Sequence, residues 1–418
     1  MKKVVVFLMI LSLLTVSFVM ASQIELSFWN GFTGPDGSYF QKIVDQFNTE
    51  FAGKIHVTMT TMAWGDYWTK VPVSLASGQG PDIGISTEDH ILSIADQGMI
   101  RPLTPYMNTL GVSKDKFYSA VWDNGYFKNQ LWGLPIDQNP LCVLYWNKTL
   151  FKEAGLNPDQ PPVNRQQFIE YAQKLTKVVN GNQQYGTMIS TGWPTYFIWY
   201  SIFRQNGGSL FNSDHTKAIY NDNAGLDALQ FLYDLVYKYH VSPTNVQVDS
   251  DVRAFQNGTV GMEFNGLWEL TAYEQTPGLD FGAVLCPQLG SEIPAVDSGA
   301  DYLVIFNKKG MSNDNIQAAL TFFKYVEEHI SIWMQSPKLP AEPSVLSDSF
   351  FQSIPMLASI TKDANNIVYP HFFNLWDQAT GPIWDAINYA LTGKKTPVQA
   401  LNDSVNTSNQ ILASQQTY

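Results

Sequence analysis

Hydrophobic residues near the start of the chain repeat at two different spacings. Ile24, Leu26 and Phe28 alternate with polar residues, which is typical of a half-buried strand. After a segment punctuated by glycines, apolar side chains in residues 39–47 fall on one face of a helix. The pattern then predicts a strand at 55–59, a helix at 66–77, a strand at 82–86, and a helix at 88–97 that ends at Gly98. This alternation predicts a mostly parallel, doubly wound α/β sheet.

Four later segments also have helical periodicity, namely residues 168–178, 224–239, 316–328 and 382–391. The chain has 418 residues, which is enough for two or three domains. No internal repeat or interdomain linker marks a boundary between them. In doubly wound sheets, ligands bind beyond the carboxyl ends of the strands. Residues 29–33 and 86–90 are therefore the first candidates for a binding site.

The first 21 residues have the features of an export signal. Lys2 and Lys3 precede an apolar run, and Val19 and Ala21 are small residues of the kind read by signal peptidase. A membrane anchor is the alternative, but the run is short and a polar strand follows at once. Cleavage removes two lysines, so the formal net charge of −12 becomes −12 − 2 = −14. Since no cysteine is available for a lipid anchor, we expect a free periplasmic protein.

The two cysteines lie in apolar, strand-like runs. Cys142 is preceded by Leu141 and followed by Val143, and Cys286 follows Leu285. Buried free thiols are the preferred interpretation. An oxidising compartment would also permit a disulfide if the two strands were neighbours.

Composition and missing motifs exclude several classes of function. Charged residues make up 15% of the chain and only four are arginine, which disfavours a nucleic-acid surface. The sequence lacks a P-loop, HExxH, CxxC and GxSxG, so no nucleotide, metal or other cofactor is predicted. A pair of catalytic carboxylates can always be chosen from 37 acids, for example Glu88 with Asp137, and carries little weight. A binding protein is therefore favoured over an enzyme.

Aromatic residues are the strongest positive signal, with 12 Trp, 20 Tyr and 25 Phe. Several tryptophans stand beside polar residues in turn-like segments, including Trp29, Trp193, Trp268 and Trp376. Such pairs suit a sugar, whose C–H faces stack on a ring while its hydroxyls bond to neighbouring polar groups. The alternative for each tryptophan is an ordinary place in the core or on the surface.

Three sequence blocks resemble the maltose-binding-protein-like family, the extracellular solute-binding proteins of carbohydrate ABC importers. The first is Gly78-Gln79-Gly80-Pro81-Asp82-Ile83. The second runs from Leu131-Trp132-Gly133-Leu134-Pro135 through Tyr145-Trp146-Asn147-Lys148 to Phe151-Lys152-Glu153-Ala154-Gly155-Leu156. The third is Phe255-Gln256-Asn257-Gly258-Thr259-Val260-Gly261-Met262. The resemblance covers essentially the whole chain after the signal. Departures such as Asn164-Arg165 and Gly261 concern helix starts and packing.

The resemblance implies an α/β, two-lobed periplasmic-binding-protein fold. Each lobe is expected to be a doubly wound sheet flanked by helices, with a ligand cleft between the lobes. The chain would cross between lobes near Ile136, Pro287 and Ile330. Lobe one would then comprise residues 22–136 plus 287–330, and lobe two residues 137–286 plus 331–418.

Strand-end positions and the resemblance together predict the ligand-binding residues. In lobe one they are Trp29, Asn30, Trp64, Glu88 and Asp89, with His90 where the family has an arginine. The crossing segment offers Asp137, Gln138 and Asn139, and the second crossing is followed by Asp297, Ser298 and Gly299. Lobe two offers Trp193, Tyr196, Trp268, Phe373 and Trp376. For each acid, a solvated charge or a helix cap is the alternative.

The function implied is that of a periplasmic receptor for a neutral mono- or oligosaccharide. Hinge closure would trap the ligand, and the closed form would deliver it to the ABC permease subunits. We expect a monomer without a membrane anchor. The alternatives are a non-sugar or phosphorylated solute on the same fold and, less favoured, a secreted glycoside-active enzyme. The scarcity of arginine argues against a strongly anionic ligand.

Overall fold

The computed structural model describes residues 23–347, 353–354, 356–357, 360, 366–370, 373 and 375–415. The predicted signal at residues 1–21 lies outside this range. Within the described part of the chain, no helix combines the length and the apolar character needed to cross a bilayer.

The first sheet contains the strands predicted at the start of the chain. Its order is β2-β1-β3-β14-β6. The strands are β1 (Ile24–Asn30), β2 (Ile55–Thr61), β3 (Ile83–Thr87), β14 (Asp301–Ile305) and β6 (Leu134–Pro135). β1 runs parallel to both β2 and β3, whereas β14 runs antiparallel to β3 and β6. The expected parallel order therefore holds for β1 to β3 only, because β14 belongs to a segment that returns from the second sheet.

Helices cover this sheet with their apolar faces. They are α1 (Asp36–Glu50), α2 (Trp64–Ala76), α3 (Glu88–Asp96) and α12 (Asn313–Glu328). In α1, the buried side chains of Phe40, Ile43, Val44 and Phe47 fall at helical spacing, as the sequence predicts. The ring of Phe40 stacks on Phe28 of β1, with centroids 5.1 Å apart. Each fully buried side chain of this size contributes roughly 1.5–3 kcal/mol.

The second sheet has the order β12-β8-β11-β10-β9. Its strands are β8 (Val143–Asn147), β9 (Lys177–Val179), β10 (Asn182–Thr187), β11 (Val260–Asn265) and β12 (Phe281–Leu285). Only β10 and β11 pair in parallel; the other three pairs are antiparallel. Around this sheet lie α6 (Lys148–Glu153), α7 (Arg165–Leu175), α8 (Trp193–Gln205), α9 (Asn223–Tyr237), α10 (Ser250–Gln256), η3 (Leu267–Glu269) and α11 (Leu270–Glu274).

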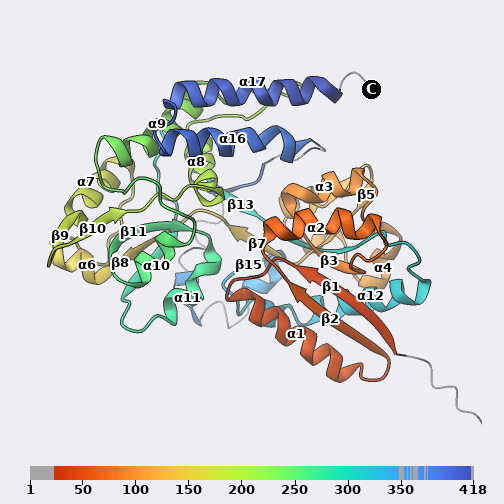
Figure 1. Cartoon of the computed structure of the whole chain (residues 1–418). Helices are drawn as coiled ribbons and strands as arrows, with labels where there is room; N and C mark the ends of the chain where they lie inside the picture. Colours follow the sequence, from red (N-terminus) through yellow and green to blue (C-terminus); the bar gives the residue numbers. More distant parts are fainter. Residues whose placement is uncertain are drawn as a thin grey trace, which may run out of the picture.

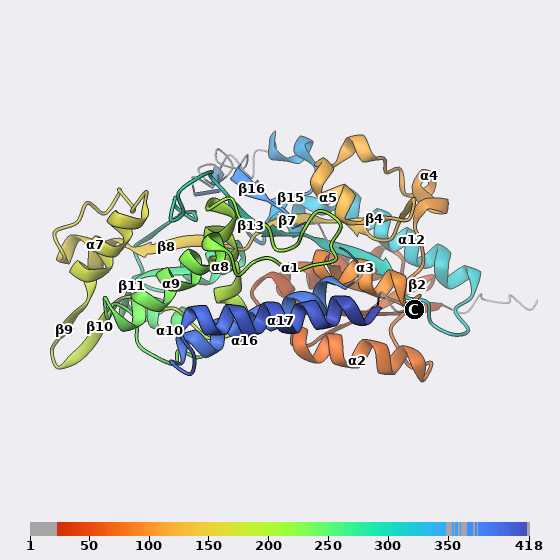
Figure 2. The ribbon, with the colours of Figure 1, turned by 90° about the horizontal axis from the view of Figure 1, so that it is seen from above.

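A small sheet connects the two bodies. Its order is β15-β7-β13-β16, with β7 (Asp137–Pro140), β13 (Val296–Gly299), β15 (Leu339–Pro340) and β16 (Ile367–Val368). β7 lies between β6 and β8 in the chain, and β13 lies between β12 and β14, so each connects the two large sheets. Figures 1 and 2 show the two bodies side by side with β7, β13 and β15 between them. We call this four-stranded sheet the hinge sheet.

The remaining elements complete the two bodies. They are η1 (Thr104–Tyr106), α4 (Met107–Leu110), η2 (Lys114–Lys116), α5 (Ser119–Asn124), β4 (Tyr126–Phe127), β5 (Gln130–Leu131), α13 (Ile330–Trp333), η4 (Pro343–Ser347), α16 (Trp376–Leu391) and α17 (Pro397–Gln415). The residue limits of the two lobes stay a prediction. Helix α13, which begins at the expected limit near residue 330, packs against α1.

Helix α16 begins earlier than the sequence predicts. A start at Pro382 is expected, because proline is favoured in a first helical turn. The helix instead begins at Trp376 and runs through Pro382. Burial of Trp376, Ala379 and Thr380 stabilises the extra turns, and the Thr380 hydroxyl donates a hydrogen bond to the Trp376 carbonyl at 2.9 Å. Tertiary packing thus outweighs the backbone hydrogen bond lost at Pro382.

The two cysteines are neighbours at one end of the β8–β12 pair, since Cys142 directly precedes β8 and Cys286 directly follows β12. The N–H of Cys286 donates to the carbonyl of Cys142 at 2.9 Å. Both thiols are free and buried, which confirms the preferred interpretation. Burial raises the pKa of Cys142 well above its usual value, so its thiol is a poor nucleophile.

Candidate ligand site between the lobes

The carboxyl ends of β1 and β3 meet at one edge of the first sheet. Asn30 ends β1, and its side chain is fully buried. Its Oδ1 accepts hydrogen bonds from the Phe32 N–H at 3.0 Å and the Thr61 hydroxyl at 3.1 Å. Its Nδ2 has no partner among the described residues. Trp29, one position earlier, is half-buried and packs against the core.

Glu88 is held at the junction of the first sheet and the hinge sheet. Its Oε2 accepts the Ala300 N–H at 2.7 Å. Gly299 leaves the room for this contact, since a Cβ there would lie 2.6 Å from the Glu88 carboxylate. Burial, together with the charge of Asp89, raises the pKa of Glu88 well above its usual value. The Glu88 carboxyl is thus biased toward its neutral form.

Asp89 is held in its charged form by its neighbours. Its Oδ1 accepts from the Thr87 hydroxyl at 2.5 Å and lies 2.8 Å from His90 Nδ1. Burial alone would raise the pKa of Asp89, but the charge and hydrogen bond of His90 and the bond from Thr87 lower it overall. His90 also stacks on Trp68, with ring centroids 3.9 Å apart.

Asp137, on β7, is bonded inside the hinge. Its Oδ1 accepts the Asp301 N–H at 2.9 Å, and its Oδ2 accepts Trp333 Nε1–H at 3.0 Å. Lys338 Nζ lies 3.4 Å from Asp137, 2.7 Å from Asp301 and 3.5 Å from Asp36. Burial, helped by the charge of Asp301, raises the pKa of Asp137 to about 8. These contacts fix the Asp137 carboxyl in the region of the hinge. Its role in ligand binding stays a prediction.

The next residues of β7 face β13 and the segment before α16. Gln138 accepts the Tyr369 hydroxyl at 2.7 Å and donates to the Pro340 carbonyl at 3.2 Å. Asn139 pairs with Gly299 in the strand register, and its buried Oδ1 has no partner in the part of the chain that is described. Ser298 is fully buried opposite Pro140. Asn139 is therefore the β7 residue with an uncommitted polar atom.

Aromatic side chains approach from the second body. Trp193 and Tyr196 lie in the first turn of α8, and Trp268 lies in η3. The rings of Trp193 and Trp268 are 5.9 Å apart. The Trp268 ring lies over Gly266, where a Cβ would come within 1.8 Å of it. Trp268 is only partly buried, so part of its side chain is exposed.

Tyr196 of the second body lies near Asp89 of the first body and Asp297 of the hinge sheet. It is 6% exposed, and its hydroxyl has no partner among the described residues. Burial raises the pKa of Tyr196 well above its usual value, and the charges of Asp297 and Asp89 add to the rise. The same three groups therefore lie close enough to interact. We use the term interlobe site for Asn30, Asp89, Asn139, Tyr196 and Asp297.

Three other predicted residues pack against neighbouring groups of the protein. Trp64 begins α2 and covers Gly31, where a Cβ would lie 2.0 Å from its ring. Phe373 stacks on His215 with centroids 4.8 Å apart, and Trp376 packs edge-to-face on Phe211 at 5.7 Å. The structure does not bring these two rings against the interlobe site through any described contact, and their ligand role stays a prediction.

Sequence analysis did not select Trp68 or Asp377. Trp68 lies one helical turn after Trp64 and stacks on it, with centroids 6.0 Å apart. The i, i+4 spacing was a usable signal for a shared face. Asp377 approaches His90 across the lobes, with 3.9 Å between Oδ2 and Nε2. No local pattern predicts a contact between residues so distant in sequence.

Acidic groups outnumber cations around the interlobe site. Burial raises the pKa of Asp297 well above its usual value, and burial with neighbouring acids raises that of Glu269 to about 7. The cations, His90 and Lys338, are paired with carboxylates. Asp89, His90 and Asp377 could in principle hold a metal ion, their ligand atoms lying within 4.8 Å of one another. Their mutual hydrogen bonding and ion pairing already account for the arrangement.

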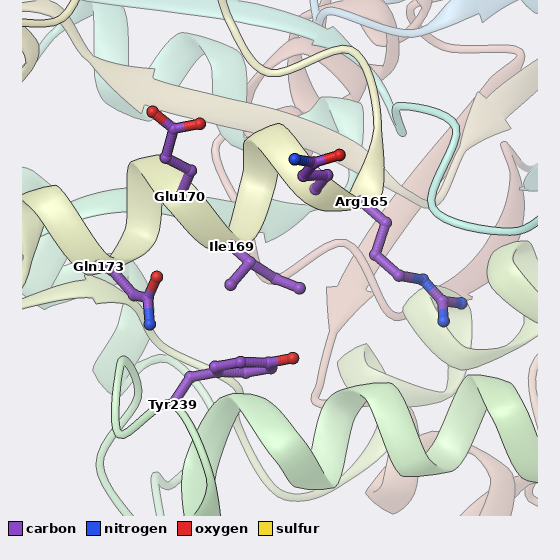
Figure 3. Close-up of a pocket in the computed structure, with 6 residues that line it drawn as sticks. Arg165, Ile169, Glu170, Gln173 and Tyr239 are labelled. Atoms are coloured by element: carbon purple, nitrogen blue, oxygen red, sulfur yellow. The ribbon is translucent and has the colours of Figure 1, made fainter.

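A surface hollow of about 550 Å³ lies elsewhere, on α7. Its lining residues are Arg165, Gln166, Ile169, Glu170, Gln173 and Tyr239. Figure 3 shows Ile169 and Gln173 of α7 facing the ring of Tyr239 across this hollow. None of these residues belongs to the predicted site, and Arg165 is held by a two-pronged ion pair with Asp227.

Two α/β bodies joined by a hinge sheet, with buried polar and aromatic groups between them, define a two-lobed periplasmic binding protein. Solved structures share this fold. An ABC substrate-binding protein of Listeria monocytogenes in complex with cycloalternan matches with a TM-score of 0.81 and 22% identity, over 94% of this chain and 100% of that one. A solute-binding protein of Thermotoga lettingae bound to α-D-tagatose matches with a TM-score of 0.80 and 23% identity, over 93% and 100%.

Sequence comparison shows the family. Residues 42–358 match the bacterial extracellular solute-binding proteins, and the chain belongs to that family. It is a solute-binding protein of the ABC importer class, not an enzyme. The sn-glycerol-3-phosphate-binding periplasmic protein UgpB of Pectobacterium atrosepticum is 22% identical over 93% of this chain and 91% of the relative.

Proposed function

We propose that the protein binds a neutral mono- or oligosaccharide between its lobes and delivers it to the permease of an ABC importer. One observation carries the proposal. Six buried side-chain polar atoms have no partner among the described residues, and three of them, Asn30 Nδ2, Asn139 Oδ1 and Tyr196 OH, belong to predicted site residues. Buried polar groups are normally bonded, so a hydroxyl-rich ligand that bonds to these three atoms would account for their lack of a protein partner. Trp193 and Trp268 add ring faces that suit a sugar.

The charge of the site favours a neutral ligand over a phosphorylated one. Asp89 is charged, and His90 and Lys338 are already paired with carboxylates. A phosphate group needs uncommitted cations, above all arginine. The UgpB relative is named for a phosphorylated polyol, whereas the similar solved structures hold cycloalternan and tagatose. Glycerol 3-phosphate is therefore the second candidate, and the test includes it.

Closure of the two lobes about the hinge sheet is the binding mode that we propose. The lobes, proposed as residues 22–136 plus 287–330 and 137–286 plus 331–418, would close on the ligand about the hinge sheet. The proposed contacts include the interlobe site with Trp29, Trp64, Glu88, Asp137, Gln138, Trp193, Trp268, Ser298, Gly299, Phe373 and Trp376. We further propose a periplasmic monomer, exported by the signal at residues 1–21 and free of a membrane anchor.

Isothermal titration calorimetry tests the proposal directly. The purified protein is titrated with tagatose, mannobiose, maltotriose, a cyclic tetrasaccharide and glycerol 3-phosphate. We expect a neutral saccharide to bind and glycerol 3-phosphate to give no heat. Binding of glycerol 3-phosphate alone would replace the proposed ligand class, and hydrolysis of a bound glycoside would restore the enzyme alternative.

A further inference from the structure

His90 makes contacts that tie three elements together. On α3, its Nδ1 lies 2.8 Å from Asp89 Oδ1 and 3.2 Å from the Thr87 hydroxyl. Its ring lies flat on Trp68 of α2, with an interplanar angle of 3°. Its second nitrogen, Nε2, lies 3.9 Å from Asp377 Oδ2 on α16. The ring orientation is therefore set by groups on three sides.

The contact with Asp377 spans the two bodies. α3 follows β3 of the first sheet, whereas α16 packs on α8, α9 and α17 of the second body and reaches α3 as well. Figure 1 shows α16 above the hinge sheet, extending from the second body toward α3 of the first. Opening about the hinge would separate His90 from Asp377 but would leave Asp89 and Trp68 beside His90. This contact therefore exists only when the lobes are close.

We propose that His90 is a positioning residue that aims the Asp89 carboxylate at the ligand and, through Asp377, favours the closed arrangement. The inference rests on the proposed function. With Oδ1 of Asp89 occupied by His90 and Thr87, the other carboxylate oxygen is left to accept from ligand hydroxyls. The same imidazole then stabilises the closed arrangement by contacting a second carboxylate, that of Asp377. Recognition and closure are thereby coupled through one side chain.

The charges around His90 determine how the contact depends on pH. Facing it are Asp89 on α3 and Asp377 on α16, while Glu88 on α3, Asp297 on β13 and Tyr196 on α8 lie close to Asp89. Burial would lower the pKa of His90, but Asp89 and Asp377 raise it to about 9. Burial raises the pKa of Asp377 to about 7. Both partners are therefore charged between about pH 7 and pH 9, and the attraction is lost as pH rises through about 9.

Variants of both partners test the inference. We expect His90→Ala and Asp377→Asn each to raise the Kd for a saccharide that the wild type binds by about fivefold or more. The effect should be in the dissociation rate, because the contact forms on closure. Asp385→Asn, an exposed acid on the same helix, is the matched control and should bind like the wild type. His90→Gln keeps a donor for Asp89 and should recover part of the affinity.

Two further measurements separate positioning from a structural role. The double variant His90→Ala with Asp377→Asn should lose less than the product of the single losses, since the two share one interaction. Wild-type affinity should fall above about pH 9, and this fall should be absent in His90→Gln. If the wild type binds a saccharide but the variants match it in Kd and pH profile, this inference alone is overturned. If the wild type binds no saccharide, the proposed function fails and the inference with it.

Discussion

The predicted ligand-binding residues differ in whether their polar atoms are already bonded to the protein. Asp137 and Gln138 bond to other residues of the chain, whereas Asn30, Asn139 and Tyr196 each keep one buried atom without a partner among the described residues. This difference separates side chains that hold the protein together from side chains that are poised for a ligand. Substitutions can distinguish the two, because they act on stability in the first case and on affinity in the second.

Tyr196→Phe should weaken saccharide binding without destabilising the free protein. Its buried hydroxyl has no protein partner, so removing it breaks no hydrogen bond of the unliganded molecule. Affinity should fall by roughly 0.5–1.5 kcal/mol if the hydroxyl bonds to the ligand. Tyr220→Phe is the control, since that hydroxyl bonds to Ser404 and Ser408 and its loss should lower the free energy of unfolding. Chemical denaturation and calorimetry measure both; a destabilised Tyr196→Phe would contradict the assignment.

Trp268→Ala should cost roughly 1–3 kcal/mol of binding free energy, the value of an aromatic anchor in a recognition site. The ring is only partly buried, so the free protein should stay folded. Trp199→Ala offers the contrast, because Trp199 is fully buried and its truncation should remove roughly 3–5 kcal/mol of stability. Unchanged affinity in Trp268→Ala, measured by calorimetry, would exclude this ring from the site.

At the scale of elements, the sequence predicts the local structure well and the long-range partners poorly. Alternation and helical spacing are local properties, so β1, α1, β2 and α3 could be predicted. The start of α16 could not, because burial against distant residues outweighs the signal of Pro382. Likewise, strand ends and motif spacing indicated Asn30 and Asp89, but Asp377 meets His90 only through the fold.

Lys338 holds the hinge elements together, and Lys338→Met should be strongly destabilising. Its ammonium is buried among Asp36 of α1, Asp137 of β7 and Asp301 of β14. Removing one side of a buried ionic network leaves uncompensated carboxylates and costs about 3–5 kcal/mol. Lys308→Met is the control, since its pair with Asp82 is partly exposed and should be worth about 1 kcal/mol or less. Equal losses in the free energy of unfolding for the two variants, measured by urea denaturation, would show that the buried network contributes no more to stability than the partly exposed pair.

At the scale of the whole molecule, the two bodies communicate through the hinge sheet and through contacts that require the lobes to be close. The His90 contact with Asp377 is of the second kind, as is the effect of Asp36 of α1 on the pKa of Glu269 of η3. A ligand can stabilise this arrangement only by binding it better than an open one.

Small-angle scattering should then show a decrease in the radius of gyration when a saccharide that the protein binds is added. The liganded curve should match the arrangement described, with α3 against α16, and the ligand-free curve should be broader. His90→Ala should shift the ligand-free population further toward the open form while the saturated curve stays the same. An identical radius with and without a saccharide that calorimetry shows to bind would mean that this protein recognises its ligand without closing.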